Sequence, residues 1–428
     1  MDWPFGILLL LAMMLVGIPI GFAMMLVGLV GVASIIGIEP SLSLLGQTYF
    51  DNARNYSLSV LPLFLIMGNF VVQSGIAEDL YKAANAWLRH WRGGLAMATV
   101  VACGGFSSVC GSSLATAATM TRISLPSMRK YGYPDGLATA AIAAGGTLGI
   151  LIPPSVILVF YGIITQQDIG KLFLAGVIPG ILGVIGYMAA VRLTLIFGGV
   201  TLPVEEKLPL GDRIRALKGV AGALVLFAFV MGGIYLGVFT VTEAAGVGAA
   251  GAFALTLLRG RLGVRETFQT LFDTAKMTAM MFFILFGALV FSNYVNLSGM
   301  TADLQAFLAT LGAHPLLLIA AIALIYVVLG CVLESLSMIV LTVPIFYPVV
   351  AAAGFDLIWF GIFVVLVTEI SYITPPVGMN AFVVRSVARS VSLAAIFKGL
   401  VPFVAMDLVR VVLLVALPAM ALFLPRSM

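Results

Sequence analysis

Apolar residues occur in long runs along most of this chain, and short polar breaks separate the runs. A run of about 20 apolar residues is long enough to cross the hydrocarbon core of a bilayer as an α-helix. A membrane β-barrel would instead alternate apolar and polar residues over segments of about ten. The pattern therefore predicts an all-α polytopic membrane protein. Apolar segments are expected over residues 5–36, 58–73, 95–125, 137–164, 172–192, 220–238, 243–258, 275–295, 316–350, 357–384 and 400–424.

Polar residues and prolines set the breaks between these segments. Pro19 and several glycines interrupt the first segment, which is either two short spans or one long kinked span. A polar stretch at 39–56 follows it, and a short polar-edged segment covers 77–89. The only long polar linker is expected at residues 193–218, in the middle of the chain.

Composition supports a membrane protein and excludes several other classes. Apolar residues make up 62% of the 428 residues and charged residues 9%, against about 25% charged in an ordinary soluble domain. A soluble fold could not cover itself with so few charges, which excludes a cytosolic enzyme, a nucleic-acid binder and a disordered scaffold. The three cysteines form no metal-binding spacing, and His90 and His314 are isolated. The N-terminus lacks the basic region of a cleaved signal peptide, so we expect its apolar run to stay in the membrane.

The position of Lys and Arg orients the segments, because short cytoplasmic loops collect these residues. Segment 95–125 has basic residues at both ends, so both ends are expected on the cytoplasmic side. A segment that enters and leaves on one side is a re-entrant hairpin. Segment 316–350 is the opposite case, since no Lys or Arg lies between His314 and Arg385. It is expected to form a second hairpin of opposite polarity.

An internal repeat relates the two halves of the chain. A shift of 222 positions places Ser113-Leu114 on Ser335-Leu336, Gly132 on Gly354 and Pro153-Pro154 on Pro375-Pro376. With the opposite charge bias, this predicts an inverted-topology repeat, the architecture of secondary transporters whose site lies near the membrane midplane. The first repeat is expected over 1–192 and the second over 219–428, joined by the cytoplasmic linker 193–218. The repeats contain hairpins at about 95–125 and 316–350 and broken helices at about 137–164 and 357–384.

Four segments could carry the chemistry, two in each repeat. The hairpin turns lie at 104–113 and 329–337, and the breaks, each with a Pro-Pro pair, lie at 145–155 and 368–380. Irregular backbone at membrane depth persists only where it is buried in protein or lines a cavity. Its carbonyls and nearby hydroxyls suit a hard cation such as Na⁺, and helix N-termini favour an anionic substrate. The competing interpretation is that small residues here only allow close helix packing, but the matched spacing in both repeats favours a site.

Two carboxylates are expected to lie deep in the membrane. Glu334 falls in the second hairpin turn, and Glu369 precedes the second break. Ionisable groups at membrane depth are energetically expensive and often functional. Each either accepts hydrogen bonds from backbone amides at a helix end or takes part in cation or proton coupling. Arg122 and Glu243, near the ends of segments, are expected at the membrane interfaces.

The four segments together resemble a known family. The stretches GGFSSVCGSSLATAATM, GTLGILIPPSVILVFYG, CVLESLSMIVLTVPIFYPV and TEISYITPPVGMNAF resemble the large membrane subunit of tripartite ATP-independent periplasmic (TRAP) transporters, and the likeness covers essentially the whole chain. The resemblance implies an elevator-type, Na⁺-driven importer of an organic acid, such as sialic acid or a C4-dicarboxylate, in the bacterial inner membrane. It implies two partners, a small four-helix membrane subunit and a periplasmic substrate-binding protein, and no enzymatic activity.

The resemblance also assigns site residues, with Na⁺ bound largely through backbone carbonyls. The first Na⁺ site would use Ser107, Ser108, Gly111, Ser112, Gly149 and Ile152. The second would use Gly330, Val332, Ser335, Thr374, Gly378 and Asn380. The substrate carboxylate would lie near Ser113, Ser155, Ser337 and Pro376.

Three alternatives compete with this interpretation. An ion channel would need a continuous pore with rings of charge or carbonyls, whereas two mid-membrane hairpins suit occlusion. An intramembrane enzyme would need a nucleophile and base at membrane depth, and both histidines are expected in loops. A Na⁺/dicarboxylate symporter of related fold that works without a binding protein is the nearest alternative. Because selection is expected to rest with the binding protein, the sequence does not name the substrate.

Overall fold

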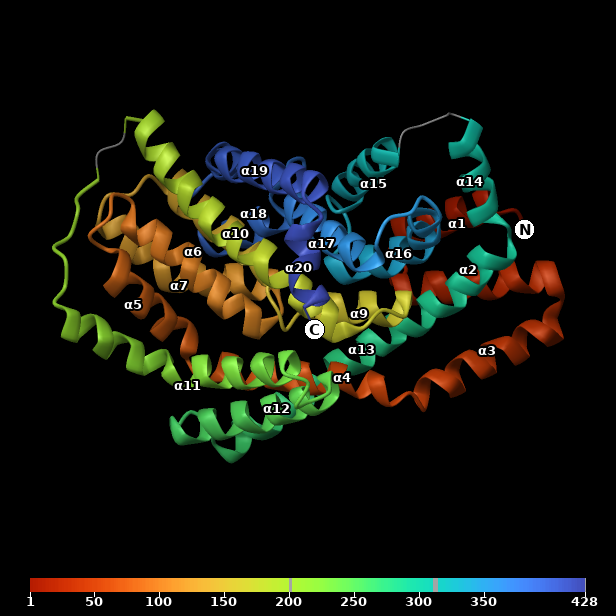
Figure 1. Cartoon of the computed structure of the whole chain (residues 1–428), viewed down its shortest axis with the longest axis horizontal. Coiled ribbons are helices and arrows are strands. Elements are labelled where there is room, and N and C mark those ends of the chain that lie inside the picture. Colours follow the sequence, from red (N-terminus) through yellow and green to blue (C-terminus); the bar gives the residue numbers. More distant parts are fainter. Residues whose placement is uncertain (200–201, 311–314, 428) are drawn as a thin grey trace.

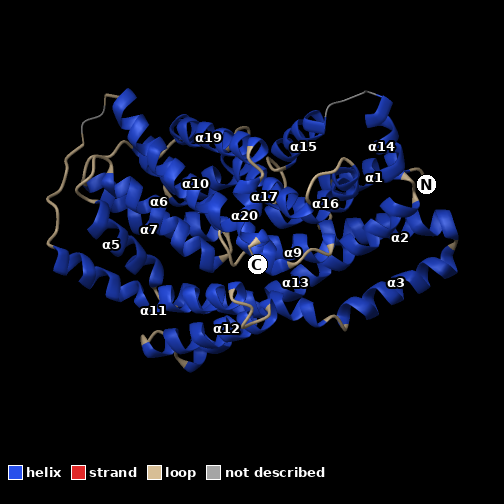
Figure 2. Cartoon of the chain, in the orientation of Figure 1, coloured by secondary structure: helices blue, strands red, loops and turns tan. Residues whose placement is uncertain are grey.

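The computed structural model describes residues 1–199, 202–310 and 315–427, and all regular secondary structure within these ranges is helical (Figure 2). His314 lies outside the described residues. The elements in chain order are α1 (Trp3–Leu15), α2 (Ile20–Ile36), α3 (Ile38–Ala53), η1 (Tyr56–Ser59), α4 (Val60–Gln73), α5 (Ile76–Leu88), α6 (Gly94–Cys110), α7 (Ser113–Lys130), α8 (Asp135–Thr147), η2 (Leu148–Ile150), α9 (Val156–Thr165), α10 (Ile169–Phe197), α11 (Leu210–Tyr235), α12 (Val241–Leu258), α13 (Val264–Leu297), α14 (Met300–Thr310), α15 (Pro315–Leu329), α16 (Ser335–Ala352), α17 (Leu357–Ile373), α18 (Met379–Val387), α19 (Leu393–Ala416) and α20 (Ala419–Arg426).

Within the described residues, seven helical segments are long and apolar enough to cross a membrane. These are η1 with α4, and α10, α11, α12, α13, α16 and α19. Several shorter apolar helices accompany them, including α9 and α17, each of which flanks a break. The expected multi-pass, all-helical membrane protein is therefore confirmed.

The first apolar segment is two helices rather than one kinked span. Helix α1 ends at Leu15, and α2 begins at Ile20 after Pro19, its N-terminal flanking residue. Proline lacks the amide that a continuous helix would need at this point, so the break falls there. The polar stretch 39–56 is not an irregular connection, because most of it forms the helix α3, of which only Ser41 is buried.

The central linker is shorter than the expected range 193–218. Helix α10 continues to Phe197, and α11 begins at Leu210 directly after Pro209. The first turns of α11 carry charged residues in two settings, since Arg215 has 77% of its side chain exposed, whereas Arg213 is buried with its guanidinium over the Trp87 ring. The apolar run therefore marks only part of the helix that carries it.

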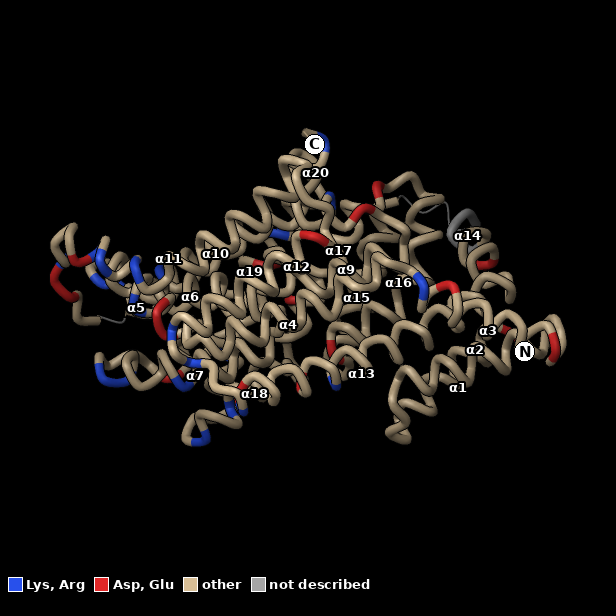
Figure 3. The backbone as a smooth tube through the Cα atoms, turned by 90° about the horizontal axis from the view of Figure 1, so that it is seen from below, with Lys and Arg blue, Asp and Glu red and all other residues tan. Residues whose placement is uncertain are grey.

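The centre of the molecule is formed by α8, α9 and α17, whose residues are almost all buried. Helices α10, α16 and α19 pack around them, while α3, α11 and α12 lie along the lower edge of the view in Figure 1. Figure 3 shows Lys and Arg gathered mainly at the end of the molecule that contains α5, α7 and α11. The broken segments thus lie in the core, away from most of the charge.

Helices α2 and α13 pack backbone against backbone. A Cβ atom on Gly28 would lie 2.8 Å from the backbone nitrogen of Phe291, and one on Gly287 would lie 2.3 Å from the carbonyl oxygen of Gly21. Glycines at these positions allow close approach of the two helices, as small residues do in membrane proteins. Helix α13 has 34 residues, more than the apolar run 275–295 suggested.

Candidate functional site

The first hairpin turn lies between α6 and α7. Gly111 ends α6 in the left-handed region, at φ +66°, and its amide donates to the Ser107 carbonyl at 2.8 Å. The Ser112 hydroxyl then accepts from the amide of Ala115 and caps α7. The two helices run back alongside each other, since the Leu95 amide near the start of α6 donates to the Tyr133 hydroxyl just after α7. The Gly-Ser pair therefore reverses the chain, as the sequence predicts.

The first break lies between α8 and α9. After α8 the chain passes through the short helix η2 and the cis Pro153-Pro154 bond, and Ser155 caps α9. The Ser155 hydroxyl donates to the Ile150 carbonyl and accepts from the Leu158 amide, and its residue is 1% exposed. This serine, expected near the substrate, already makes two hydrogen bonds within its own break.

The first turn and the first break are in direct contact. A Cβ on Gly149 would lie 2.1 Å from the Cβ of Ser107 and 2.4 Å from its carbonyl carbon. Ile152 lies beside the same helix, with its Cδ1 3.6 Å from the place of a Cβ on Gly104. Ser107 and Ser108 are both buried. The structure therefore brings together residues that the sequence assigned to one Na⁺ site from two separate segments.

The second turn and second break meet in the same way. A Cβ on Gly330 would lie 2.0 Å from the Ser371 hydroxyl oxygen and 2.4 Å from the Ser371 Cβ. The amide of Ser335 donates to the hydroxyl of Tyr372. At the break, the Thr374 hydroxyl donates to the Ile370 carbonyl at 2.6 Å, before the cis Pro375-Pro376 bond. Gly378, at φ +60°, then precedes α18.

The two turns differ in exposure. Ser113, at the start of α7, is buried and Gly111 is partly exposed. In the second turn Val332 is 72% exposed, and Pro376 of the second break is also exposed. Ser337, expected near the substrate, is half-buried and donates its amide to Glu334.

Asn380 links the two halves of the site. It is fully buried, and its side chain forms hydrogen bonds with the Ser113 hydroxyl at 2.7 and 2.9 Å. Its amide nitrogen also donates to the Ala143 carbonyl of α8 at 2.9 Å. The polar contacts of Asn380 thus connect the second break to the first turn and the first broken helix.

The chemistry available at the turns is that of neutral oxygen atoms. Hydroxyls and carbonyls supply the polar groups, and within the described ranges there is no group of three His, Cys, Asp or Glu residues that could hold a metal ion. The last carbonyls of a helix lack partners within that helix, and helices end at both turns and both breaks. This donor set suits a weakly charged hard cation better than a transition metal.

The two carboxylates that were expected to lie deep have different surroundings. Glu334 is exposed and accepts the Ser337 amide at the N-terminus of α16, which matches the expectation of a bond to a helix-end amide. That expectation is wrong for Glu369, which is 0% exposed and pairs with the guanidinium of Arg410 on α19. Glu243 accepts from the backbone and side chain of Thr240 in a capping box at the exposed start of α12.

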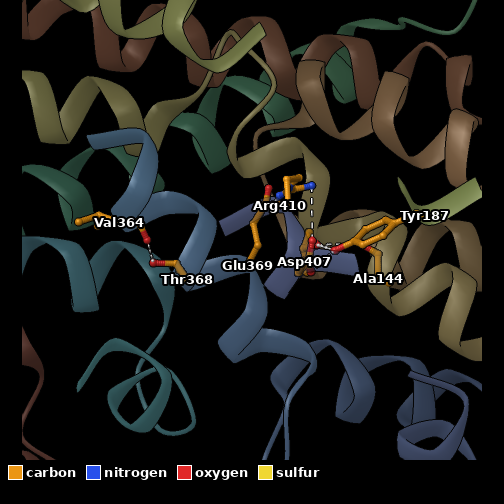
Figure 4. A network of polar contacts seen from close by, with 8 residues as sticks. Ala144, Tyr187, Val364, Thr368, Glu369, Asp407 and Arg410 are labelled. Atoms are coloured by element: carbon orange, nitrogen blue, oxygen red, sulfur yellow. Dashed lines mark hydrogen bonds and ion pairs between the residues drawn. The ribbon is translucent and has the colours of Figure 1, made fainter. Parts of the chain in front are cut away.

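Sequence reasoning missed the partners of Glu369. Figure 4 shows Glu369, Arg410, Asp407 and Tyr187 pointing toward one another from α17, α19 and α10. Asp407 and Arg410 fall inside the apolar run 400–424, and that position was the available signal, since charges within a membrane segment face the protein interior. Among the described residues, these four make no hydrogen bond or ion pair with the residues assigned to the turns.

Comparison with known proteins gives a consistent result. The family described as "Tripartite ATP-independent periplasmic transporter, DctM component" matches residues 7–420. The C4-dicarboxylate TRAP transporter large permease protein DctM of Pseudomonas aeruginosa is 34% identical, covering 93% of each chain. The sialic acid TRAP transporter large permease protein SiaM of Vibrio cholerae is 31% identical, covering 97% of this chain and 96% of that one. The crystal structure of the Alcanivorax borkumensis YdaH transporter has a TM-score of 0.63 at 13% identity, covering 91% of this chain and 88% of that chain.

Proposed function

Because the chain belongs to the DctM component family of tripartite ATP-independent periplasmic transporters, a family of multi-pass inner-membrane permeases, we propose that it imports a small organic acid with Na⁺ as the coupling ion. The observation that carries this proposal is the pairing of each hairpin turn with one break. Gly149 packs on Ser107 in the first pair, and Gly330 packs on Ser371 in the second. Two oxygen-lined junctions of irregular backbone inside an apolar protein are the arrangement expected of ion sites in a secondary transporter.

We propose that the two halves, 1–192 and 219–428, are inverted repeats. In this proposal α6–α7 and α15–α16 are re-entrant hairpins, and α8–α9 and α17–α18 are broken membrane helices. Capping supports the equivalence, since Ser112 accepts the amide three residues on at the start of α7 and Glu334 does the same for α16. The hairpins and broken helices would move together as an elevator against the peripheral helices.

The first Na⁺ would lie where Ser107, Ser108, Gly111 and Ser112 meet Gly149 and Ile152. The second would lie where Gly330, Val332 and Ser335 meet Thr374, Gly378 and Asn380. The substrate carboxylate would lie between the two turns, near Ser113, Ser155, Ser337 and Pro376. Helix α7 begins at Ser113, and a helix N-terminus favours an anion.

The comparisons support the substrate class and the partners. The relatives named above transport a C4-dicarboxylate and sialic acid, both carboxylates. We propose that this chain likewise takes an organic acid delivered by a periplasmic binding protein, and that it works with a small membrane subunit. A symporter that needs no binding protein is the alternative, and uptake into vesicles with and without the binding protein separates the two.

The sodium sites are tested by removing one hydroxyl from each. The double variant Ser108→Ala plus Thr374→Ala is reconstituted with its membrane partner and binding protein, and uptake is measured against Na⁺ concentration. We expect the half-saturating Na⁺ concentration to rise at least about tenfold, which corresponds to 1.4 kcal/mol. Unchanged Na⁺-dependent uptake would contradict the assignment.

A matched control removes two similar hydroxyls elsewhere. The Ser108 hydroxyl in α6 donates to the carbonyl three residues earlier in the chain. The Thr374 hydroxyl, just after α17, donates to the carbonyl four residues earlier. Ser298 and Thr194 make the same two kinds of bond away from the turns. The variant Ser298→Ala plus Thr194→Ala should therefore leave the Na⁺ dependence unchanged.

A further inference from the structure

A cluster of charged groups lies in the core of the protein, apart from both turns. Glu369 on α17 and Asp407 and Arg410 on α19 are 0%, 0% and 4% exposed. Arg410 forms an ion pair with Glu369 through Nη2 and lies 3.5 Å from Asp407 Oδ1 through Nη1. Gly183 on α10 makes room for the guanidinium, since a Cβ there would lie 1.9 Å from Nη1. We call these three charged residues the buried triad (Figure 4).

The charges of the buried triad do not balance when both carboxyl groups are ionised. Two carboxylates and one guanidinium then leave one net negative charge in the apolar core. An uncompensated charge in such an environment is so costly that a group becomes neutral instead. A single bound proton removes the imbalance.

Other groups packed against α17 do not supply a balancing positive charge. Tyr187 on α10 donates to Asp407 Oδ2 at 2.6 Å, and Thr147 on α8 lies 3.3 Å from the Tyr187 hydroxyl. Both groups are neutral. Within the described part of the chain, the titratable residues on the other neighbouring helices make neither a hydrogen bond nor an ion pair with Glu369; these are Asp135, Tyr161, Lys171, Arg192, Tyr326, Tyr347, Arg385, Lys398 and Arg426.

Each carboxyl group has one oxygen that could carry the proton. Asp407 accepts from the Tyr187 hydroxyl through Oδ2, and its buried Oδ1, 3.5 Å from Arg410 Nη1, has no hydrogen-bond partner. Glu369 accepts from Arg410 through Oε2 only, and its buried Oε1 has no hydrogen-bond partner either. Charge on an unsolvated, unpartnered oxygen is disfavoured, so a single proton fits on Oε1 of Glu369 or on Oδ1 of Asp407.

The position of the buried triad links it to both breaks. The shift of 222 that superposes the two Pro-Pro pairs places Thr147 on Glu369. A shift of 223 places Pro179 of α10 on Pro402 of α19 and Tyr187 on Arg410. The contacts from Thr147 through Tyr187 and Asp407 to Arg410 and Glu369 therefore join equivalent positions of the two halves. At these equivalent positions the first half has the hydroxyl side chains of Thr147 and Tyr187, and the second half has the charged side chains of Glu369 and Arg410.

We propose that the buried triad is a proton-binding site, distinct from the Na⁺ and substrate sites, in which either Glu369 or Asp407 holds one proton while the other carboxylate balances the charge of Arg410. Binding is the reaction of a proton from water with one of these two carboxylates. Loss of that proton leaves an unbalanced charge in the core and loosens α17 from α19. Because α17 leads directly into the second break, the protonated form is the one that holds this break in place.

The direct test is infrared spectroscopy of the purified complex at neutral pH, which distinguishes protonated from ionised carboxyl groups. Wild type should show one protonated carboxyl that is lost in Glu369→Gln. It should also be lost in Asp407→Asn, because Glu369 then pairs alone with Arg410 and ionises. Both substitutions keep the size of the side chain, and the exposed Glu266→Gln serves as the control that loses no protonated carboxyl.

Two results would overturn the proposal. One is a wild-type protein with no protonated carboxyl that is lost in Glu369→Gln or in Asp407→Asn. The other is a signal that appears or disappears with Na⁺ in the buffer, since a cation rather than a proton would then balance the charge. Neither measurement requires substrate or transport, so this test stands or fails independently of the proposed function.

A second arm uses uptake and rests on the proposed function. Wild-type uptake should fall as the pH rises past the point where the buried triad loses its proton, by up to about tenfold per pH unit. Glu369→Gln, which keeps the neutral form at every pH, should not show this fall. The same alkaline decline in wild type and Glu369→Gln would refute the link between the proton and transport.

Discussion

The contact between Gly330 and Ser371 makes a sharp prediction about the second turn. The substitution Gly330→Ala adds a Cβ that would lie 2.0 Å from the Ser371 hydroxyl oxygen and 2.4 Å from the Ser371 Cβ. Rotating the hydroxyl away relieves only the first clash, because the Cβ of Ser371 is fixed to the backbone of α17. The turn and the broken helix must therefore separate, and overpacking of this kind costs about 1–3 kcal/mol.

The same geometry predicts a specific rescue. Replacing Ser371 with glycine removes both clashing atoms, and the nearest remaining atom to the new Cβ is the Tyr326 carbonyl oxygen at 3.0 Å. The double variant Gly330→Ala plus Ser371→Gly should recover most of the lost function. Full recovery is not expected, because glycine near the end of α17 itself costs about 0.5–1 kcal/mol.

The assay is Na⁺-dependent uptake by the reconstituted complex, with thermal unfolding of the same preparations in parallel. Gly330→Ala should raise the half-saturating Na⁺ concentration by about 5- to 150-fold, from 1–3 kcal/mol at 1.4 kcal/mol per tenfold. Gly232→Ala is the control, because a Cβ there meets nothing within 4 Å. A Gly330→Ala protein with normal Na⁺ dependence, or a double variant no better than the single one, would refute the reasoning.

Three further predictions follow from the site. Gly149→Ala should impair uptake at least as strongly as Gly330→Ala does. Adding Ser107→Gly should not rescue uptake, because the Ser107 carbonyl carbon still lies 2.4 Å from the new Cβ. Rescue in the uptake assay would contradict this geometry. Asn380→Leu should lower the melting temperature of the complex, because the buried Ser113 hydroxyl and Ala143 carbonyl lose their bonds to Asn380, at a cost of about 1–3 kcal/mol. Asn380→Asp should retain the bond to Ser113. Equal melting temperatures for wild type and Asn380→Leu would count against this prediction. Glu334→Gln should keep the cap of α16 and Glu334→Ala should lose about 1 kcal/mol in unfolding experiments, and no difference between the two would show that the cap contributes nothing.

The all-helical class and the positions of the two breaks could be predicted because their signals are local. Prolines at 153–154 and 375–376 stop a helix wherever they occur, and the structure places both breaks within the expected ranges. The first turn was equally readable, since glycine at 111 adopts the left-handed conformation that other residues rarely do. The local conformational preferences of proline and glycine are enough to predict the two breaks and this turn.

Other features could not be predicted because they depend on packing or on distant partners. The pairing of Glu369 with Arg410 joins residues 41 positions apart in sequence. The average hydropathy of the apolar run 400–424 conceals Asp407 and Arg410. Taken one by one, each is a charged residue within a predicted membrane segment and so indicates a buried polar partner. The polar stretch 39–56 forms the helix α3, which contacts α2 and α13 although only Ser41 of it is buried, and run lengths do not reveal this helix.

The long helix α13 has a mechanical consequence. At 1.5 Å per residue its 34 residues measure about 51 Å, well beyond the roughly 30 Å of bilayer hydrocarbon. The excess lies at the start of the helix, from residue 264 to about 274, where most side chains are exposed, so this end projects beyond the hydrocarbon. Because Gly21 and Gly28 seat α2 directly on the backbone of α13, the two helices resist bending as one strut. Helices α14 and α16 contact α13. A force that displaces the projecting end of α13 would therefore displace α14 and α16 by nearly the same distance, because bending of α13 would take up little of the movement.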